Sequence, residues 1–290
     1  MRGTRIGGEL DMLSWESFPH GPAIAQSNET DGDLSPPHVM MILPNGVAVN
    51  TEMTEKPKMR HKLKAGRFIE DRRAWILDKA RGCRVVHLGC TDAGFLEDKI
   101  NQDMQLHAQL ANACSKLIGI DIDRSGIEQL NARGYEDILC ADIARDHAQI
   151  IEEVAIRMGA CDLIICGEVL EHVLNQGSFL EGVRQLAIAN QATVIISVPN
   201  AFSLEGFVSV GLGVEDVHPD HKCYFSQVTL NTLLRQTGFR TVETCFYSRD
   251  RAKSRLRRIL KRAIAMTVFA IRPQLADGLI VVAEPDEMPA

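Results

Sequence analysis

The fold is decided by the stretch Asp162-Leu163-Ile164-Ile165-Cys166-Gly167-Glu168-Val169-Leu170-Glu171-His172-Val173. Its first half is a continuous apolar run, which is typical of a strand that is buried on both faces of a parallel sheet. The apolar run ends at Gly167, and the acidic residue Glu168 follows it. Because ligands of open α/β sheets bind beyond the carboxyl ends of the strands, this change predicts both a parallel sheet and a site at its edge.

Apolar segments of strand length recur on both sides of this stretch, and helical patterns separate most of them. The predicted strands cover 83–88, 116–120, 137–140, 161–166, 192–198, 241–247 and 278–283. The predicted helices between them cover 106–114, 123–132, 143–157, 177–189 and 226–237. The alternation predicts an α/β fold with a Rossmann-like, doubly wound, mostly parallel seven-stranded sheet. An antiparallel edge strand is expected because the last two strands depart from strict alternation.

The chain before the first strand divides into two regions. Residues 1–57 are rich in Gly, Pro, Ser, Asn and acidic residues without a sustained period, which predicts a poorly ordered extension with one short apolar patch at 39–43. Residues 58–290 are predicted to form one domain. Its first helix is expected over 61–80. The inward positions of that helix would be Leu63, Phe68, Trp75 and Ile76.

The bulk composition bears on compartment and partners. The formal net charge is -6 and aromatic residues make up only 5% of the chain, so nucleic acid is not the expected partner. None of the eight cysteines forms a C-x-x-C pair, which argues against a zinc ribbon and favours a reducing, cytoplasmic location. No apolar run reaches the roughly 18 residues of a membrane span.

Glycines and carboxylates follow the first three predicted strands. Gly89-Cys90-Thr91-Asp92-Ala93-Gly94 follows the first, Asp121 the second and Asp142 the third. Glycine lets the backbone approach a ligand, Asp121 could accept both hydroxyls of a ribose, and Asp142 could accept from an adenine amino group. These residues predict an adenosine-shaped site. By themselves they leave open a nicotinamide cofactor or S-adenosylmethionine, and each could also serve only as a helix N-cap or turn residue.

Four segments resemble a known family. Val85–Cys90, Gly119–Asp123 and above all Asp162–Val173 are similar to motifs of class I S-adenosylmethionine-dependent methyltransferases. Val217–Ser226 resembles a segment of the subgroup that includes ubiquinone-type and glycan- or metabolite-pathway enzymes. Two positions depart from the family pattern, since His87 replaces an acidic residue and Thr91 replaces a glycine. A dehydrogenase is the weaker alternative because the spacing G-x-G-x-x-G is absent.

The resemblance implies a methyltransferase with S-adenosyl-L-methionine as its cofactor. The expected cofactor-binding residues are Gly89, Cys90, Thr91, Gly94, Asp121, Ile122, Asp142, Ile143 and Glu168. The expected acceptor is a hydroxyl of a small molecule or saccharide. The alternatives are a binding module that has lost catalysis and an RNA methyltransferase.

A hydroxyl acceptor calls for a base or a metal, and the candidate groups near the strand ends are Glu168, Glu171, His172, His218 and His221. Of these, His172, His221 and Glu168 are the predicted catalytic residues. Glu168, Glu171, His172 and His221 could hold Mg²⁺, and the resemblance implies such a site in some relatives with a Glu-x-x-Glu-His pattern. A metal-free histidine base and a purely loop-orienting role remain open. His87 is expected to be a core histidine, and Cys90 and Cys166 are expected to be packing residues.

A basic segment lies between the last two predicted strands. Residues 249–262 carry eight Lys or Arg residues against one acid, Asp250, and apolar residues follow at helical spacing. This pattern predicts a basic amphipathic helical insertion at about 250–272. Its basic face could simply be solvated, or residues 251–268 could contact anionic lipid.

Overall fold

The computed structural model describes residues 39–42, 48–51, 60–92, 94, 96–102, 104–248 and 265–286. The chain forms two compact units, Met1–His61 and Lys62–Ala290. In the first unit, β1 (Val39–Ile42) and β2 (Ala48–Thr51) pair antiparallel, so the apolar patch predicted within the extension is a strand. The rest of residues 1–57 lies outside the described residues, and so does the prediction that this part is poorly ordered.

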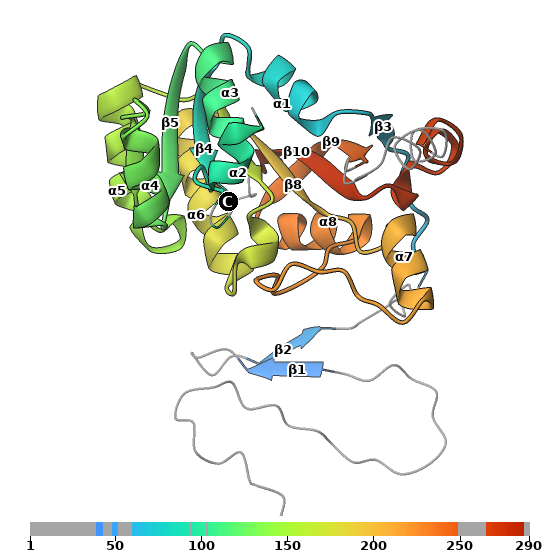
Figure 1. The fold of residues 1–290 in the computed structure, drawn as a ribbon. Helices are drawn as coiled ribbons and strands as arrows, with labels where there is room; N and C mark the ends of the chain where they lie inside the picture. The colour runs from blue at the N-terminus through green and yellow to red at the C-terminus, as the bar shows by residue number, and fades with distance from the viewer. Residues whose placement is uncertain are drawn as a thin grey trace, which may run out of the picture. The chain divides into compact units, whose positions relative to one another are not determined.

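The second unit is built on an eight-stranded sheet with the order β3-β9-β10-β8-β7-β4-β5-β6 (Figure 1). Its strands are β3 (Arg67–Ile69), β4 (Arg84–Leu88), β5 (Lys116–Asp121), β6 (Ile138–Cys140), β7 (Leu163–Gly167), β8 (Thr193–Pro199), β9 (Phe239–Tyr247) and β10 (Gly278–Pro285). β10 runs antiparallel to both of its neighbours, and the other pairs are parallel. The predicted Rossmann-like class is confirmed. All seven predicted strands are present, and β3 and β9 extend the sheet beyond the antiparallel strand.

The prediction of one helix over residues 61–80 is wrong in its first half. β3 occupies part of this range, and α1 covers only Arg72–Ala80. The helix begins there because the Asp71 carboxylate accepts hydrogen bonds from two backbone N–H groups of the first turn, at 2.8 and 3.1 Å. Ile76 is fully buried as predicted, whereas Leu63 precedes the helix and is 51% exposed.

Helices cover both faces of the sheet (Figure 1). They are α1, α2 (Leu96–Asn101), α3 (Leu106–Ala113), α4 (Arg124–Asn131), α5 (Ile143–Met158), α6 (Gln176–Asn190), α7 (Leu204–Gly211) and α8 (Gln227–Gln236), with shorter turns at η1 (Leu170–His172), η2 (Ala265–Phe269) and η3 (Pro273–Leu275). Successive residues of β7 serve opposite faces. Leu163 and Ile165 pack in one core with α1 and α3, and Ile164 and Cys166 pack in the other with α5, α6 and α8. The apolar run of β7 is therefore continuous because both of its faces are buried.

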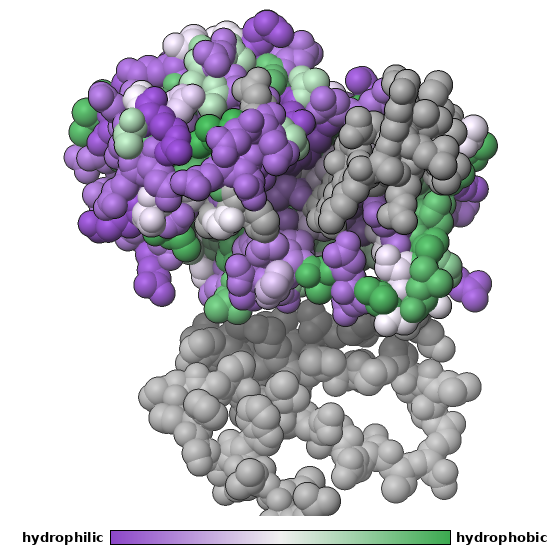
Figure 2. Space-filling view, viewed as in Figure 1, coloured by the Kyte–Doolittle hydropathy of each residue, from purple (hydrophilic) through white to green (hydrophobic). Residues whose placement is uncertain are grey.

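α7 is an apolar helix without a buried side chain. Phe207 and Val210 on the helix are 78% and 65% exposed, and Leu212 just after it is 79% exposed. Figure 2 shows apolar residues gathered at the lower right, where Figure 1 places α7. Of the predicted basic insertion, residues 249–264 lie outside the described part, and its end forms the π-helical turn η2. Within the described helices, none is long and apolar enough to cross a bilayer.

Candidate functional site

The chain leaves β4 through a turn that only glycine can make. Gly89 has φ +73°, and a Cβ at this position would lie 2.3 Å from Cγ2 of Val169. Its N–H donates to the carbonyl of Ile120 at 2.9 Å. L-residues rarely adopt this backbone conformation, so both the dihedral angle and the close approach require glycine here. The contact brings the loop after β4 against the segment that follows β7.

Thr91, which stands where the family pattern has a glycine, holds the carboxylate of Asp121. Its backbone N–H and its hydroxyl both donate to Asp121 Oδ2 at 2.9 Å, and the backbone N–H of Asp123 donates to Oδ1 at 3.0 Å. Thr91 is fully buried. Because a carboxylate offers about four lone-pair sites, these three donors leave Asp121 able to accept from a ribose hydroxyl as well.

Other predicted cofactor residues lie along the ends of the adjacent strands β4, β5 and β6. Gly94 has φ +80° and is exposed, and a Cβ there would meet nothing within 4 Å. Ile122 after β5 is 74% exposed and can pack against a flat ring. Asp142 caps α5, since its Oδ1 accepts from the backbone N–H of Ala144 at 3.0 Å. The apolar side chain of Ile122 and the carboxylates of Asp121 and Asp142, at the ends of β5 and β6, suit the adenosine part of S-adenosylmethionine.

Besides Thr91, two of the predicted cofactor residues are packed into the interior. Ile143 is only 4% exposed, and Cys90 is fully buried. Burial, followed by the charge of Asp121, strongly raises the pKa of the Cys90 thiol. Either residue can therefore contribute backbone groups to the loops around the cofactor, while its side chain serves the core.

Glu168 is held in a network that joins distant parts of the chain. Its backbone has φ +60°, and its Oε1 accepts a hydrogen bond from the Tyr247 hydroxyl. The same oxygen lies 3.7 Å from Nη1 of Arg72, and Nη1 donates to Oγ of Ser197 at 2.7 Å. Sequence reasoning missed Arg72, Ser197 and Tyr247 because they come from α1, β8 and β9. Ser197 left a sequence signal, as a hydroxyl within the apolar run Val194–Val198.

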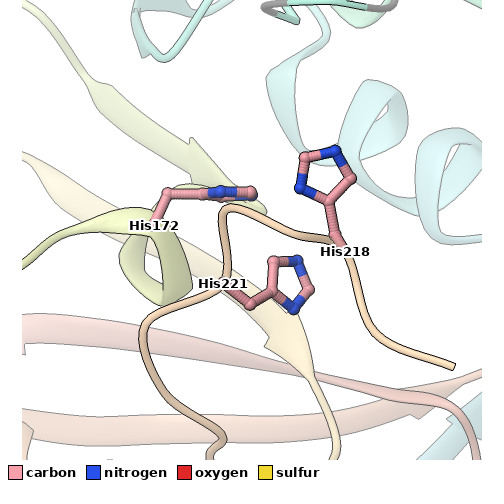
Figure 3. A group of neighbouring side chains, drawn as sticks. All are labelled: His172, His218 and His221. Atoms are coloured by element: carbon pink, nitrogen blue, oxygen red, sulfur yellow. The ribbon is translucent and has the colours of Figure 1, made fainter. Parts of the chain in front are cut away.

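The loop between α7 and α8 brings two further histidines to His172, which ends η1. The rings of His172, His218 and His221 each offer a nitrogen, and these three atoms lie within 4.8 Å of one another (Figure 3). Glu171 is 1% exposed, and its Oε1 lies 4.0 Å from Nε2 of His221. Burial, followed by the nearby His218, lowers the pKa of His172. At neutral pH this favours a neutral ring with a lone pair.

The structure therefore assembles the predicted catalytic and metal residues only in part. His172 and His221 lie together, and Glu171 is next to His221. Glu168 instead accepts from Tyr247 and lies near Arg72. The group of close ligand atoms contains His218, which the predicted metal set lacks.

The comparisons with known proteins bear on this arrangement. A family model described as "Methyltransferase domain" matches residues 59–244. The chain belongs to this methyltransferase family. With the fold described above, membership makes it an S-adenosylmethionine-dependent methyltransferase of class I, and S-adenosylmethionine its expected cofactor. No curated protein matches the chain.

Several solved methyltransferases are similar to this chain at low sequence identity. A SAM-dependent methyltransferase from Archaeoglobus fulgidus is 18% identical, with a TM-score of 0.42, and the match covers 73% of this chain and 94% of that one. Magnesium protoporphyrin IX methyltransferase from Synechocystis PCC 6803, solved with bound SAH, is 17% identical with a TM-score of 0.45, over 74% and 80% of the two chains. A SAM-dependent methyltransferase from Aquifex aeolicus is 15% identical with a TM-score of 0.42, over 73% and 88%.

The methyltransferase keeps its remaining candidate groups in the core. His87 is buried, as predicted, and its Nδ1 lies 3.3 Å from Nδ1 of His107, so one ring donates and the other accepts. Burial lowers the pKa of His107 to about 4 and that of His87 well below its ordinary value. Cys166 is also fully buried, and burial raises the pKa of its thiol. These groups are packing residues rather than nucleophiles.

Proposed function

We propose that this methyltransferase transfers the methyl group of S-adenosylmethionine to a hydroxyl oxygen of a small molecule or saccharide. The observation that carries this proposal is the cluster of three imidazoles just beyond the carboxyl ends of β7 and β8. S-adenosylmethionine supplies a methyl group on a sulfonium, which any well-aligned nucleophile can accept. A hydroxyl differs from other acceptors in needing a partner that takes its proton, and neutral imidazole is suited to that task.

The cofactor would bind along the ends of β4, β5 and β6. Asp121 accepts from the ribose hydroxyls, Asp142 lies where an adenine amino group would donate, and Gly89 and Gly94 keep the connecting loop free of side chains. Glu168 fixes the segment after β7 through Tyr247 and Arg72, so we assign it a positioning role. The protein then contributes mainly alignment, which by itself is worth several kcal/mol in a bimolecular displacement.

The acceptor would lie between this loop and the histidines. Its oxygen forms a bond to the methyl carbon as the bond between carbon and sulfur breaks, and His172 or His221 takes the hydroxyl proton. The products are the methyl ether, S-adenosylhomocysteine and a protonated ring, which returns its proton to water. Mg²⁺ on Glu168, Glu171, His172 and His221 is the less favoured arrangement, because Mg²⁺ prefers oxygen ligands and Glu168 is engaged by Tyr247.

Calorimetry and a transfer assay test this function. We expect S-adenosylhomocysteine to bind and NAD to give no heat, and labelled methyl groups to appear in a metabolite fraction that contains hydroxyls. Tight NAD binding without a response to S-adenosylhomocysteine would contradict the cofactor. Cofactor binding without transfer to any metabolite or RNA fraction would identify a binding module, and transfer to RNA alone would overturn the acceptor class.

We further propose a cytoplasmic protein that contacts anionic lipid. All eight cysteines are free, which suits a reducing compartment. The basic segment supplies positive charge, and α7 supplies exposed apolar side chains. The Asn200 side chain before α7 donates to the carbonyls of Gln274 and Ala276, both at 2.8 Å. The stretch that follows the basic segment is thus tied to the start of the α7 loop.

A further inference from the structure

The three histidines are brought together by two segments that are fixed to each other. His172 ends η1 directly after β7, and His218 and His221 lie on the loop before α8. The backbone N–H of Lys222 donates to the carbonyl of Glu171 at 2.7 Å, and that of His221 donates to the carbonyl of His218 at 3.0 Å. Backbone contacts therefore hold the loop against η1, so the rings are arranged before any ligand arrives.

The chemistry of the rings is that of a nitrogen ligand set. Figure 3 shows the three rings turned toward a common space. The backbone N–H of Asp220 donates to Nδ1 of His218 at 3.2 Å, so Nδ1 carries the lone pair of the neutral ring and is the nitrogen that can bind an ion, in place of this hydrogen bond. Ring nitrogens in tetrahedral zinc sites lie about 3.3 Å apart, because each lies about 2.0–2.1 Å from the metal. Small side-chain rotations close the present spacing, which is within 4.8 Å, to that value.

A buried carboxylate stands behind one of the rings. Glu171 Oε1 lies 4.0 Å from Nε2 of His221, and the side chain of Glu171 is 1% exposed. Metal-bound histidines are commonly oriented by such an outer carboxylate, which also compensates part of the metal's charge.

We propose that His172, His218 and His221 bind one divalent transition-metal ion of the Zn²⁺ type, with Glu171 as an outer partner and a fourth position open to the acceptor. Imidazole suits Zn²⁺ and its neighbours, whereas Mg²⁺ selects oxygen ligands. Binding of the ion does not depend on the proposed function. Its role does, and it replaces the free histidine base: an acceptor hydroxyl on the open position would release its proton to water more readily, because a bound zinc ion lowers the pKa of a coordinated water to about 7.

Metal binding is tested directly on the full chain after chelator treatment. Zn²⁺ is titrated against a competing metal indicator, and Co²⁺ is added separately to read the coordination geometry from its visible absorption. We expect one ion per chain and a tetrahedral Co²⁺ spectrum. Replacement of any of the three histidines by Ala should weaken binding at least about tenfold, and Glu171→Gln should weaken it by about tenfold. His147→Ala on α5 is the matched control and should bind as the wild type does.

Circular dichroism and S-adenosylhomocysteine calorimetry on the same variants show that they are folded and keep the cofactor site. The site is overturned if the stripped protein binds no Zn²⁺ saturably, or if all three histidine variants bind as tightly as the control. Zn²⁺ binding without any methyl transfer would contradict the proposed function and leave the metal site standing. Methyl transfer that persists undiminished in a chelator, with the metal removed, would overturn the role of the ion at the acceptor.

Discussion

The carboxylate of Asp121 accepts hydrogen bonds from two loops of the fold, and it is also predicted to accept one from the cofactor. Thr91 and Asp123 use three of its lone-pair directions, and both belong to segments that line the expected cofactor site. Such a carboxylate is already oriented before the ribose arrives, so little side-chain entropy is lost on binding. Thr91 therefore compensates for the missing family glycine by positioning Asp121.

Asp121→Ala should weaken the binding of S-adenosylhomocysteine by about tenfold to a hundredfold. The reason is that hydrogen bonds to a charged group are worth roughly 1.5–3 kcal/mol. Calorimetry measures the change, and thermal unfolding shows whether the loops remain folded. Asp162→Ala is the control, since this exposed carboxylate pairs with Arg84 at the opposite end of the strands. Unchanged affinity in a folded Asp121→Ala protein would place the cofactor elsewhere.

Gly89→Ala should reduce the free energy of unfolding by about 2–5 kcal/mol. A left-handed backbone costs a non-glycine residue roughly 1–2 kcal/mol, and overlap with Val169 adds a packing penalty of about 1–3 kcal/mol. Gly94→Ala shares the positive φ but has open space, so it should lose only the backbone part. Urea denaturation compares the two. Equal losses would show that Val169 does not confine Gly89.

Single site residues can be predicted from the sequence where they directly follow a strand. Gly89, Asp121 and Asp142 could be found because the carboxyl ends of parallel strands mark the site. Arg72 and Tyr247 could not, since they meet Glu168 only after α1 and β9 are placed. His218 was predicted as a candidate base or metal ligand, but not as a member of the metal set, because nothing in the sequence shows that its ring lies beside His172 and His221.

The helices and strands differ in how clearly the local sequence predicts them. Strands buried on both faces, such as β7, are evident from their continuous apolar runs. β3 was hidden because Arg67–Ile69 is too short to show a period, and an apolar helix pattern follows at once. Asp71 was the available signal for the helix start. The β1 and β2 pair was missed although Asn45-Gly46, a hairpin signal, separates its two apolar segments.

The contact between β4 and α3 makes stability depend on pH. His87 and His107 stay neutral in the folded protein because burial lowers their pKa values, to about 4 for His107. Above the unfolded pKa of about 6.5 both states are neutral, and the pair adds no pH dependence. As the pH falls below that value, the unfolded chain binds protons that the folded chain does not. The contribution of His107 is therefore lost as the pH falls from about 6.5 to about 4, by about 1.4 kcal/mol per pH unit, and that of His87 is lost in the same direction.

His107→Leu should make this dependence shallower by one histidine's contribution. Urea denaturation at pH 7, 6 and 5 measures the free energies of unfolding of the wild type and the variant. Gln109→Leu, on the same helix α3, changes no titratable group and should keep the slope of the wild type. Parallel pH profiles for the wild type and His107→Leu would show that His107 carries its proton in the folded state.

The whole molecule carries its charge unevenly. Although the net charge is -6, residues 249–262 carry eight basic residues. Because salt screens distant charges, repulsion between an anionic surface and the acidic rest of the chain need not act at this segment. α7 adds an apolar helix that packs on the core through Leu204 and leaves Phe207 and Val210 exposed. Both features lie between strands of the sheet in sequence, so neither interrupts the catalytic scaffold.

Vesicle sedimentation tests this surface. We expect the wild type to sediment with vesicles that contain phosphatidylglycerol, to do so less with phosphatidylcholine alone, and to be released by salt. Each basic residue near such a surface contributes about 1 kcal/mol, so Arg257→Ala with Arg258→Ala should weaken binding by about thirtyfold. Phe207→Ser should weaken it by about tenfold, because the apolar ring is lost from the interface. Ile156→Ser is the matched control, since this residue on α5 is 72% exposed and should make no difference. If the arginine variant binds as the wild type does, the basic face is merely solvated. If Phe207→Ser alone is without effect, charge is sufficient and α7 has another partner.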